Sequence, residues 1–186
     1  MVLLPITGPG VVIDRLAVGD AAALSASHSD VDNARHQGWQ SPLSEDEAQG
    51  FIDEMADVEV LGPEGVQLAL REQAGGPLIG DLYLVRAAEP DVVEVGLTLV
   101  PGAHGRGLAT AAVRAVLAAL FDERALGVRR VDAYLDEANE RSAALFDRLG
   151  FLPLARLEGA STRRDGTSGD ELHFALDRHT WLALRT

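Results

Sequence analysis

The chain has 186 residues, of which 47% are hydrophobic, so residues 1–186 suffice for a single domain with one substantial core. It contains no cysteine and no lysine, which excludes disulfides, thiolate metal ligands, a cysteine nucleophile, a Walker A phosphate loop and Schiff-base chemistry. The net charge of −13 argues against duplex nucleic acid as a partner, because that binding depends on neutralising phosphates with Lys and Arg.

The apolar runs of the sequence are short. The start, MVLLPITGPG, has no basic flank and too short an apolar run for a signal peptide, and no later run approaches the length of a membrane span. The absence of cysteine gives no indication of an oxidising compartment. We therefore expect a cytoplasmic protein with no membrane association.

The first half of the chain predicts a strand, two helices and then three strands. The run VVIDRLAV predicts a strand over residues 11–18, and Asp20 is placed to cap a short helix through AAALSASHS. The capping-box pattern SEDE, residues 44–47, should open a helix that reaches about Met55. Turn residues then separate three apolar runs and predict antiparallel hairpins; the runs are VQLALRE, PLIGDLYLV and VVEVGLTLV.

The second half alternates helices and strands. Residues 108–123 have helical spacing with one apolar face, formed by Leu108, Ala112, Val116 and Leu120. VRRVDAYL predicts a strand, and Asn139 should cap a helix that Gly150 ends. FLPLARLEG and DELHFALD alternate as a final strand pair. This order predicts an α/β fold whose central sheet is partly parallel and partly antiparallel, with flanking helices.

The stretch VPGAHGRGLAT, residues 100–110, places Gly102, Gly105 and Gly107 between a strand and the start of a helix. Unpaired backbone N–H groups converge at such a junction and the helix dipole favours negative charge, so phosphate is the expected ligand. Two other interpretations are a simple tight turn and a dinucleotide fingerprint. Against the fingerprint, Thr110 occupies the third glycine position and the loop lies in the middle of the chain.

LTLVPGAHGRGLAT, followed after a helix and a strand by NERSAALFDRLGF, resembles the acetyl-coenzyme A signature of the GNAT N-acetyltransferase superfamily. The loop of that family reads Arg or Gln, x, x, Gly, x, Gly or Ala. Those positions hold His104, Gly107 and Ala109 here, and His104 is a departure from the family pattern. The resemblance covers nearly the whole chain. Within the superfamily, the sequence is similar to the branch that includes the ribosomal-protein N-terminal (Rim-type) acetyltransferases. It implies a single-domain GNAT fold.

The same resemblance implies acetyl-coenzyme A as the co-substrate, with no metal. Backbone amides of about Gly105 to Ala109 would surround the pyrophosphate, and Arg106 and Arg141 would lie near phosphate. Backbone groups of two leucines on the preceding strand would pair with the pantetheine arm, and one N–H there would stabilise the oxyanion. The residues expected to bind the coenzyme are therefore Leu97, Leu99, His104, Gly105, Arg106, Gly107, Leu108, Ala109, Thr110, Asn139 and Ser142.

Forming an amide from a thioester needs a neutral amine and a protonated leaving thiolate. Glu94 lies on the strand that leads into the glycine loop, and an acid at this position commonly acts as the base in the family, often through water. The resemblance therefore implies that Glu94 is the base. Alternatively, the alternation of Val93, Val95 and Leu97 places Glu94 on the solvent side of its strand.

The candidate donor of the thiolate proton is Ser142, one helical turn after Asn139. Many family members carry a tyrosine seven residues after the matching asparagine, whereas this chain has Phe146, which cannot donate a proton. The similar branch has serine at the position of Ser142 and lacks the tyrosine. The other interpretation of Ser142 is a first-turn serine that bonds its own backbone.

Other chemistries have little support in the sequence. There is no Gly-x-Ser-x-Gly elbow, and the 5 histidines show no metal-ligand spacing. His28 and His36 lie near Trp39 and either line an acceptor pocket or lie on the surface.

The predicted function is acetyl transfer to a primary amine by direct attack, with a protein N-terminus as the acceptor. An aminoglycoside, polyamine or other small amine is the alternative acceptor, and a non-catalytic regulatory module that binds acetyl-coenzyme A is the alternative class. A homodimer is an open possibility for the assembly.

The charge is unevenly distributed along the chain. Residues 1–93 hold 16 acidic residues and 4 arginines, whereas residues 94–186 hold 13 acidic residues and 12 arginines. Because the first half of this fold supplies most of the acceptor wall, we expect a cationic acceptor.

Overall fold

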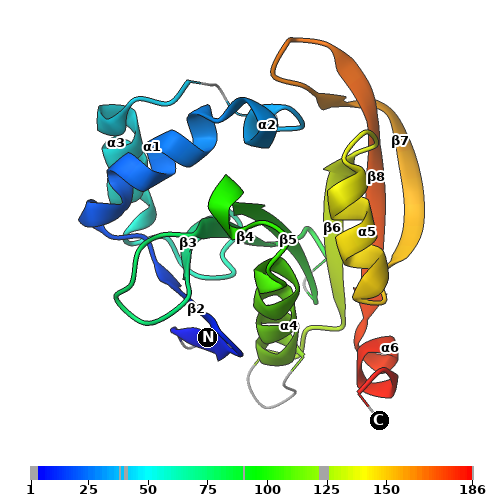
Figure 1. Ribbon diagram of the computed structural model, residues 1–186. Coiled ribbons are helices and arrows are strands. Elements are labelled where there is room, and N and C mark those ends of the chain that lie inside the picture. Colours follow the sequence, from blue (N-terminus) through cyan, green and yellow to red (C-terminus); the bar gives the residue numbers. More distant parts are fainter. Residues whose placement is uncertain (1–3, 38, 40–41, 90, 122–125, 186) are drawn as a thin grey trace.

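The computed structural model describes residues 4–37, 39, 42–89, 91–121 and 126–185, and they form an α/β structure around one eight-stranded sheet (Figure 1). The strand order is β1-β2-β3-β4-β5-β6-β8-β7. β5 and β6 pair in parallel and every other pair is antiparallel, which confirms the predicted mixed sheet. The strands are β1 (Ile6–Gly8), β2 (Val11–Arg15), β3 (Val66–Arg71), β4 (Gly80–Arg86), β5 (Val92–Leu99), β6 (Arg130–Asp136), β7 (Leu152–Thr162) and β8 (Ser168–Asp177).

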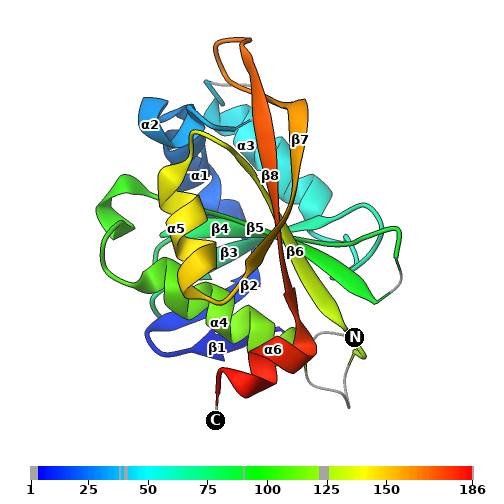
Figure 2. The same ribbon diagram turned by 90° about the vertical axis from the view of Figure 1, so that its right-hand side faces the viewer.

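Helices cover both faces of the sheet. They are α1 (Ala21–Ser29), α2 (Val31–Ala34), α3 (Glu45–Met55), α4 (Leu108–Leu120), α5 (Glu140–Arg148) and α6 (Arg178–Ala183), with short 3-10 turns at Val18–Asp20 and Pro101–Ala103. Side chains of α1 and α3 form one hydrophobic cluster with Ala69 of β3, whereas α4 packs in a second and larger cluster with Leu68 and Leu70. Because successive strand residues point to opposite faces, the two clusters lie on opposite sides of the sheet. Figure 2 shows α4, α5 and α6 together on one side of the molecule.

Local sequence signals account for the main helices. The side chain of Ser44 accepts a hydrogen bond from the N–H of Glu47, and Glu47 bonds back to the N–H of Ser44, so the capping box predicted for α3 is present. The predicted apolar face of α4 is confirmed, because all four of its residues are buried. The end of this helix prediction, residues 122–123, lies outside the described residues.

Asp20 differs from its prediction. It occupies the N-cap position of α1, but its side chain makes no cap hydrogen bond. Its carboxylate instead accepts two hydrogen bonds from the buried guanidinium of Arg71, at 2.8 and 2.5 Å, and one from the N–H of Ala17. A buried arginine without a carboxylate partner would strongly destabilise the fold. Asp20 therefore pairs with the distant Arg71 and does not cap the helix.

Three short elements were not predicted: β1, α2 and α6. None is longer than six residues, so none carries a readable periodic pattern. None of the helices in the described parts of the chain combines the length and the apolar character that a bilayer span needs.

Candidate active site

The central parallel strands part soon after they pair. β5 pairs with β6 only over Val92–Glu94, against Arg130–Asp132, although both strands continue further. The N–H of Val100 donates to the carbonyl of Ile79, on the β4 side, so alternation turns the backbone polar groups of Leu97 and Leu99 away from β4. Within the described residues, the edge of β5 beyond Glu94 therefore has no strand partner on the β6 side.

Part of that edge is already occupied. The carbonyl oxygen of Leu99 accepts a hydrogen bond from the side-chain amide of Asn33 at 2.9 Å, and Nε2 of His104 lies 3.0 Å from the same oxygen. His104 therefore ties the glycine loop to the end of β5, and Asn33 brings α2 to the same point. At Leu99 the N–H is the group left for a ligand, whereas Leu97 offers both its N–H and its carbonyl.

The glycine loop turns directly into α4. Gly105 and Gly107 have φ angles of +70° and +78°, a left-handed conformation that glycine adopts without strain. Gly107 is the N-cap residue of α4, and no side chain caps that end. A Cβ at either glycine would meet no atom within 4 Å, so the backbone conformation rather than crowding requires glycine. The first N–H groups of α4 therefore have no side-chain cap, as an anion site needs.

Arg106, which was expected near phosphate, is paired within the chain. Its guanidinium donates two hydrogen bonds to the carboxylate of Glu72, just after β3. The two side chains are 48% and 44% exposed, so the pair lies at the surface.

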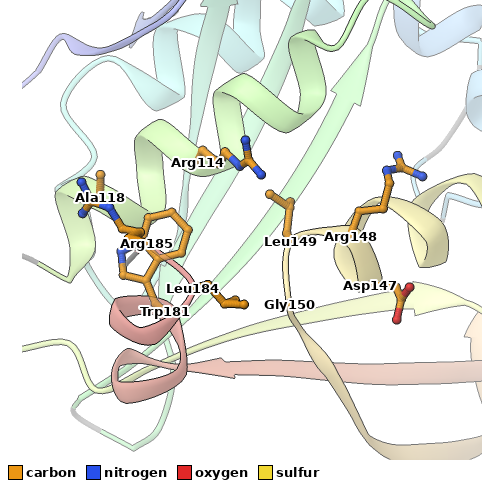
Figure 3. Close-up of a pocket in the computed structure, with 9 residues that line it drawn as sticks. All are labelled: Arg114, Ala118, Asp147, Arg148, Leu149, Gly150, Trp181, Leu184 and Arg185. Atoms are coloured by element: carbon orange, nitrogen blue, oxygen red, sulfur yellow. The ribbon is translucent and has the colours of Figure 1, made fainter.

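A cavity of about 540 Å³ lies where α4, the end of α5 and α6 meet (Figure 3). Trp181 of α6 and Leu184, the residue that follows α6, face Leu149, and the guanidinium of Arg114 extends toward Leu149 from α4. Arg185 lies over the ring of Trp181, 5.5 Å from its centroid. In the described parts of the chain, no carboxylate pairs with three of the lining arginines, which are Arg114, Arg148 and Arg185.

Glu94 is half-buried and projects from the opposite face of the sheet to the α4 cluster, together with Gly96 and Thr98. The strand register places Asp132 of β6 beside Glu94 and Tyr83 of β4 opposite Gly96. Burial raises the pKa of Glu94 above its usual value, and the nearby negative charges of Glu171 and Asp132 raise it further. Glu94 therefore lies among polar side chains and not on an open solvent face.

α5 begins with the cap that the sequence predicts. Asn139 caps the helix by accepting a hydrogen bond from the N–H of Ser142 at 3.1 Å. Phe146 is buried and packs edge-on against Phe151, with ring centroids 5.0 Å apart. The hydroxyl of Ser142 stays a predicted thiolate donor on the first turn of α5.

The two histidines near Trp39 differ in burial, since His28 is buried and His36 is partly exposed. His28 is buried and stacks on Trp39, with ring centroids 4.2 Å apart, and its Nε2 lies 3.3 Å from Asp81. His36 lies 3.4 Å from Asp136 of β6. Both histidines thus face acidic side chains. Within the described residues, no group of three or more His, Asp or Glu side chains is placed to hold a metal ion.

Several polar residues on the face of Glu94 were not predicted. They come from β6 and β8, and only the register of these strands brings them beside β5. A motif of consecutive residues does not show in which register two strands pair. The alternation of side chains along β6 and β8 was the one signal for these residues in the sequence. The residues are Asp132, Tyr134, Glu171 and His173.

Comparison with known proteins gives a consistent result. A family model described as an acetyltransferase (GNAT) domain matches residues 11–152. A mycothiol acetyltransferase of Salinispora arenicola is 40% identical over 82 residues, which are 44% of this chain and 22% of the relative. The chain thus spans about a fifth of the length of this curated relative.

Solved structures share the fold at low sequence identity. A GNAT-family acetyltransferase from Bacillus anthracis has a TM-score of 0.80 at 16% identity and covers 95% of this chain and 99% of its own. A spermidine N-acetyltransferase from Vibrio cholerae, solved in complex with CoA and spermine, has a TM-score of 0.77 at 15% identity and covers 93% and 98%. At this identity the likeness shows the fold alone.

Proposed function

The chain belongs to the GNAT acetyltransferase family, and from this premise we propose that it transfers an acetyl group from acetyl-coenzyme A to a primary amine by direct attack. The observation that carries the proposal is the free edge of β5, which has the open N-terminus of α4 at one end and Glu94 at the other. A thioester laid along this edge brings its carbonyl close to a carboxylate.

The second half of the chain supplies the groups that would hold the coenzyme. The amides of Gly105 to Ala109 suit the pyrophosphate, and the backbone of Leu97 with the N–H of Leu99 suits the pantetheine amides. Within the described residues, the arginines of the cavity between α4, α5 and α6 have no carboxylate partner, which makes this side of the protein tolerant of a polyanion. The residues present therefore fit acetyl-coenzyme A.

In the proposed reaction, the amine nitrogen attacks the thioester carbonyl and the carbon–sulfur bond breaks. Glu94 receives the proton that the amine loses, directly or through water, and its raised pKa makes its carboxylate a stronger base than an exposed one. Ser142 donates a proton to the departing thiolate, because Phe146 has no hydroxyl to give. A backbone N–H at Leu97 or Leu99 stabilises the oxyanion.

The preferred acceptor is a protein or peptide N-terminus that carries positive charge, in keeping with the resemblance to the ribosomal-protein N-terminal acetyltransferases. An α-amine with a pKa of about 8 is roughly a tenth neutral at pH 7, whereas a lysine amine near 10.4 is neutral to only a few parts in ten thousand. The α-amine is thus the easier nucleophile for a carboxylate base. The excess of acidic residues in residues 1–93 favours cations.

A small amine is the second candidate acceptor. The half-buried carboxylates around Glu94 favour it, since a compact cation can reach them without a peptide groove. The Vibrio cholerae structure with CoA and spermine shows that a protein of this fold binds such an amine.

The test is release of coenzyme A thiol from acetyl-coenzyme A by the purified chain, with peptides of neutral, acidic and basic N-terminal sequence and with small amines. We expect turnover with basic acceptors, and the preference for them should shrink as salt rises, because screening acts within about 10 Å at roughly 0.1 M. Binding of the coenzyme without thiol release on any amine would instead favour a regulatory module. A preference for acidic peptides would contradict the cationic acceptor.

A further inference from the structure

A short segment of the first half of the chain contacts both central strands beyond the point where they part. We call this segment the strap; it consists of residues 31–36, which are α2 and the two residues after it (Figure 1). The side-chain amide of Asn33 donates a hydrogen bond of 2.9 Å to the carbonyl of Leu99, the last residue of β5. Nδ1 of His36 lies 3.4 Å from the carboxylate of Asp136, the last residue of β6. The strap thus connects two strand ends that, in the described structure, do not pair with each other.

The strap has a defined backbone conformation of its own. Asp30 caps α2, because its carboxylate accepts hydrogen bonds from the N–H groups of Asp32 and Asn33, at 3.1 and 2.9 Å. Ala34 is fully buried, and its N–H donates to the carbonyl of Asp30 at 2.9 Å. The cap and the buried alanine therefore fix the backbone from which Asn33 reaches Leu99.

Asp136 is a fixed anchor for the other end of the strap. Its buried carboxylate accepts hydrogen bonds from Ser161 at 2.7 Å and from Arg163 at 2.8 Å, both in the hairpin of β7 and β8. It also accepts one from the N–H of Ala138 at 2.9 Å, just before α5. Nδ1 of His36 makes no hydrogen bond with a described residue, so its contact with Asp136 is the looser of the two fastenings.

The strap contacts the same face of the sheet that carries Glu94. Glu94 is paired in register with Asp132, and Asp136 follows Asp132 by an even number of positions, so all three side chains project from one face. The split is the stretch beyond Glu94 and Asp132 where β5 and β6 no longer pair. It runs on the order of 13–17 Å along the strands before it reaches Leu99 and Asp136. An amine that approaches Glu94 from this face therefore passes beside the strap.

Leu99 connects the strap to the groups proposed to hold the coenzyme. Its carbonyl oxygen has two lone pairs, one for Asn33 and one for His104, whose Nε2 lies 3.0 Å away. Its N–H is left for the pantetheine arm. The strap and the glycine loop are thus fastened to one oxygen atom, which fixes the acceptor side of the split relative to the thioester. Loosening the strap would leave the glycine loop and the first turn of α4 in place.

We propose that Asn33 and His36 are positioning residues, which fasten the strap across the split and thereby hold the acceptor amine in line with the thioester. Each acts through the strap and not on the reacting atoms. A misplacement on the order of 1 Å costs up to about 10²-fold in rate, so the loss of either fastening lowers the efficiency of transfer with little effect on coenzyme binding. This inference rests on the proposed function.

The experiment measures thiol release with Ala-Arg-Gly-Gly and with 1,4-diaminobutane as acceptors, and the calorimetric Kd for acetyl-coenzyme A. Asn33→Leu removes the amide donor with little change of volume, and His36→Ala removes the imidazole. We expect each to lower kcat/KM for the acceptor by roughly 10- to 100-fold, with the Kd within about twofold of wild type. His36→Asn, whose amide nitrogen replaces Nδ1, should retain most of the rate. Arg35→Ala is the matched control and should leave kcat/KM unchanged, because Arg35 lies between them in the strap and pairs with Asp32 at the surface.

Hydrogen–deuterium exchange gives a readout that does not need turnover. The N–H of Ala34, which bonds to the carbonyl of Asp30, should exchange faster in Asn33→Leu and His36→Ala than in wild type. Exchange in α4 should stay unchanged, because the fastenings to the strap do not involve this helix. Circular dichroism checks that the variants fold.

The outcomes separate this inference from the proposed function. Wild-type kcat/KM in both Asn33→Leu and His36→Ala, or an equal loss in Arg35→Ala, would overturn the positioning role and leave acetyl transfer standing. A loss of coenzyme affinity as large as the loss of kcat/KM would also overturn it, since the strap would then support the coenzyme site. If no amine releases thiol from wild type, the proposed function fails. Faster exchange of Ala34 in the variants then still supports the fastening, and unchanged exchange overturns it.

Discussion

The guanidinium of Arg106 donates hydrogen bonds of 2.9 and 2.7 Å to the two carboxylate oxygens of Glu72. This is the forked geometry with which arginine also binds phosphate. Glu72 thus holds the side chain that was expected to bind the coenzyme. An exposed ion pair contributes little, so a phosphate group with more charge is able to displace the carboxylate.

Removing the competitor should therefore strengthen coenzyme binding. In Glu72→Gln, Arg106 is free and one negative charge near the loop is lost, so we expect the Kd for acetyl-coenzyme A to fall by roughly two- to fivefold at low salt. Isothermal titration calorimetry measures the change. In an Arg106→Ala background the same substitution should give a smaller gain in affinity for acetyl-coenzyme A. An unchanged or higher Kd in Glu72→Gln alone would contradict the displacement of Glu72 by phosphate at Arg106.

The glycine loop gives a second prediction. Gly107→Val introduces a β-branched side chain at φ +78° and should shift the first N–H groups of α4, so that binding of acetyl-coenzyme A is lost. Gly102→Ala is the matched control, because Gly102 has no positive φ and a Cβ there also meets no atom within 4 Å. Circular dichroism checks that both variants fold. Wild-type affinity in Gly107→Val would refute the assignment of the loop.

The predictable parts of the fold are those encoded by neighbouring residues. The buried face of α4 and the capping box at Ser44 depend on spacings of three or four positions, so each is visible in a single stretch. Asp20 shows the limit of this approach. The pattern around it predicts a helix cap, but its partner Arg71 lies 51 positions away and no local rule contains that pairing.

The candidate site also contains residues that a local motif predicts and residues that only the strand register brings together. The loop from His104 to Ala109 is contiguous, and its signature was readable although His104 departs from it. Glu171 and His173 reach the site only through the register of β6 and β8, and a shift of one residue would turn both to the other face. The partial burial of Glu171, which raises the pKa of its carboxyl, is not written in the sequence either.

Glu94 should control the acidic side of the pH–rate profile. A raised pKa means that Glu94 keeps its proton to a higher pH than an exposed glutamate, and a base must be ionised to act. We expect turnover to fall as pH drops through this raised pKa. Glu94→Gln should lower turnover by about 10²- to 10⁴-fold, with coenzyme affinity close to wild type and without that pH dependence. Full activity in Glu94→Gln would show that the amine loses its proton by another route.

The same shift has a consequence for stability. Because the folded state favours the protonated form, ionised Glu94 destabilises the fold above its raised pKa, and this penalty disappears as pH falls through it. Glu94→Gln should therefore raise the Tm near neutral pH, and the difference from wild type should narrow at acidic pH. Thermal unfolding at several pH values measures it, and a Tm lowered at neutral pH would show that ionised Glu94 has a stabilising partner.

The hydroxyl of Ser142 is the remaining group to test. If it protonates the departing thiolate, Ser142→Ala should slow turnover by roughly 10²-fold while coenzyme affinity changes little, and Ser142→Thr, which keeps a hydroxyl, should retain most of the rate. The cap is not disturbed, because Asn139 bonds the backbone N–H of residue 142 and not its side chain.

Phe146→Tyr probes the position where many family members carry the acid. Phe146 is 4% exposed and packs against Phe151, so a hydroxyl there that stays inside the core should lower the Tm. A Phe146→Tyr substitution that instead restores turnover to Ser142→Ala would show that the ring reaches the thiolate and that Ser142 had replaced the missing tyrosine. Wild-type turnover in Ser142→Ala would remove Ser142 from the mechanism and leave water as the proton source.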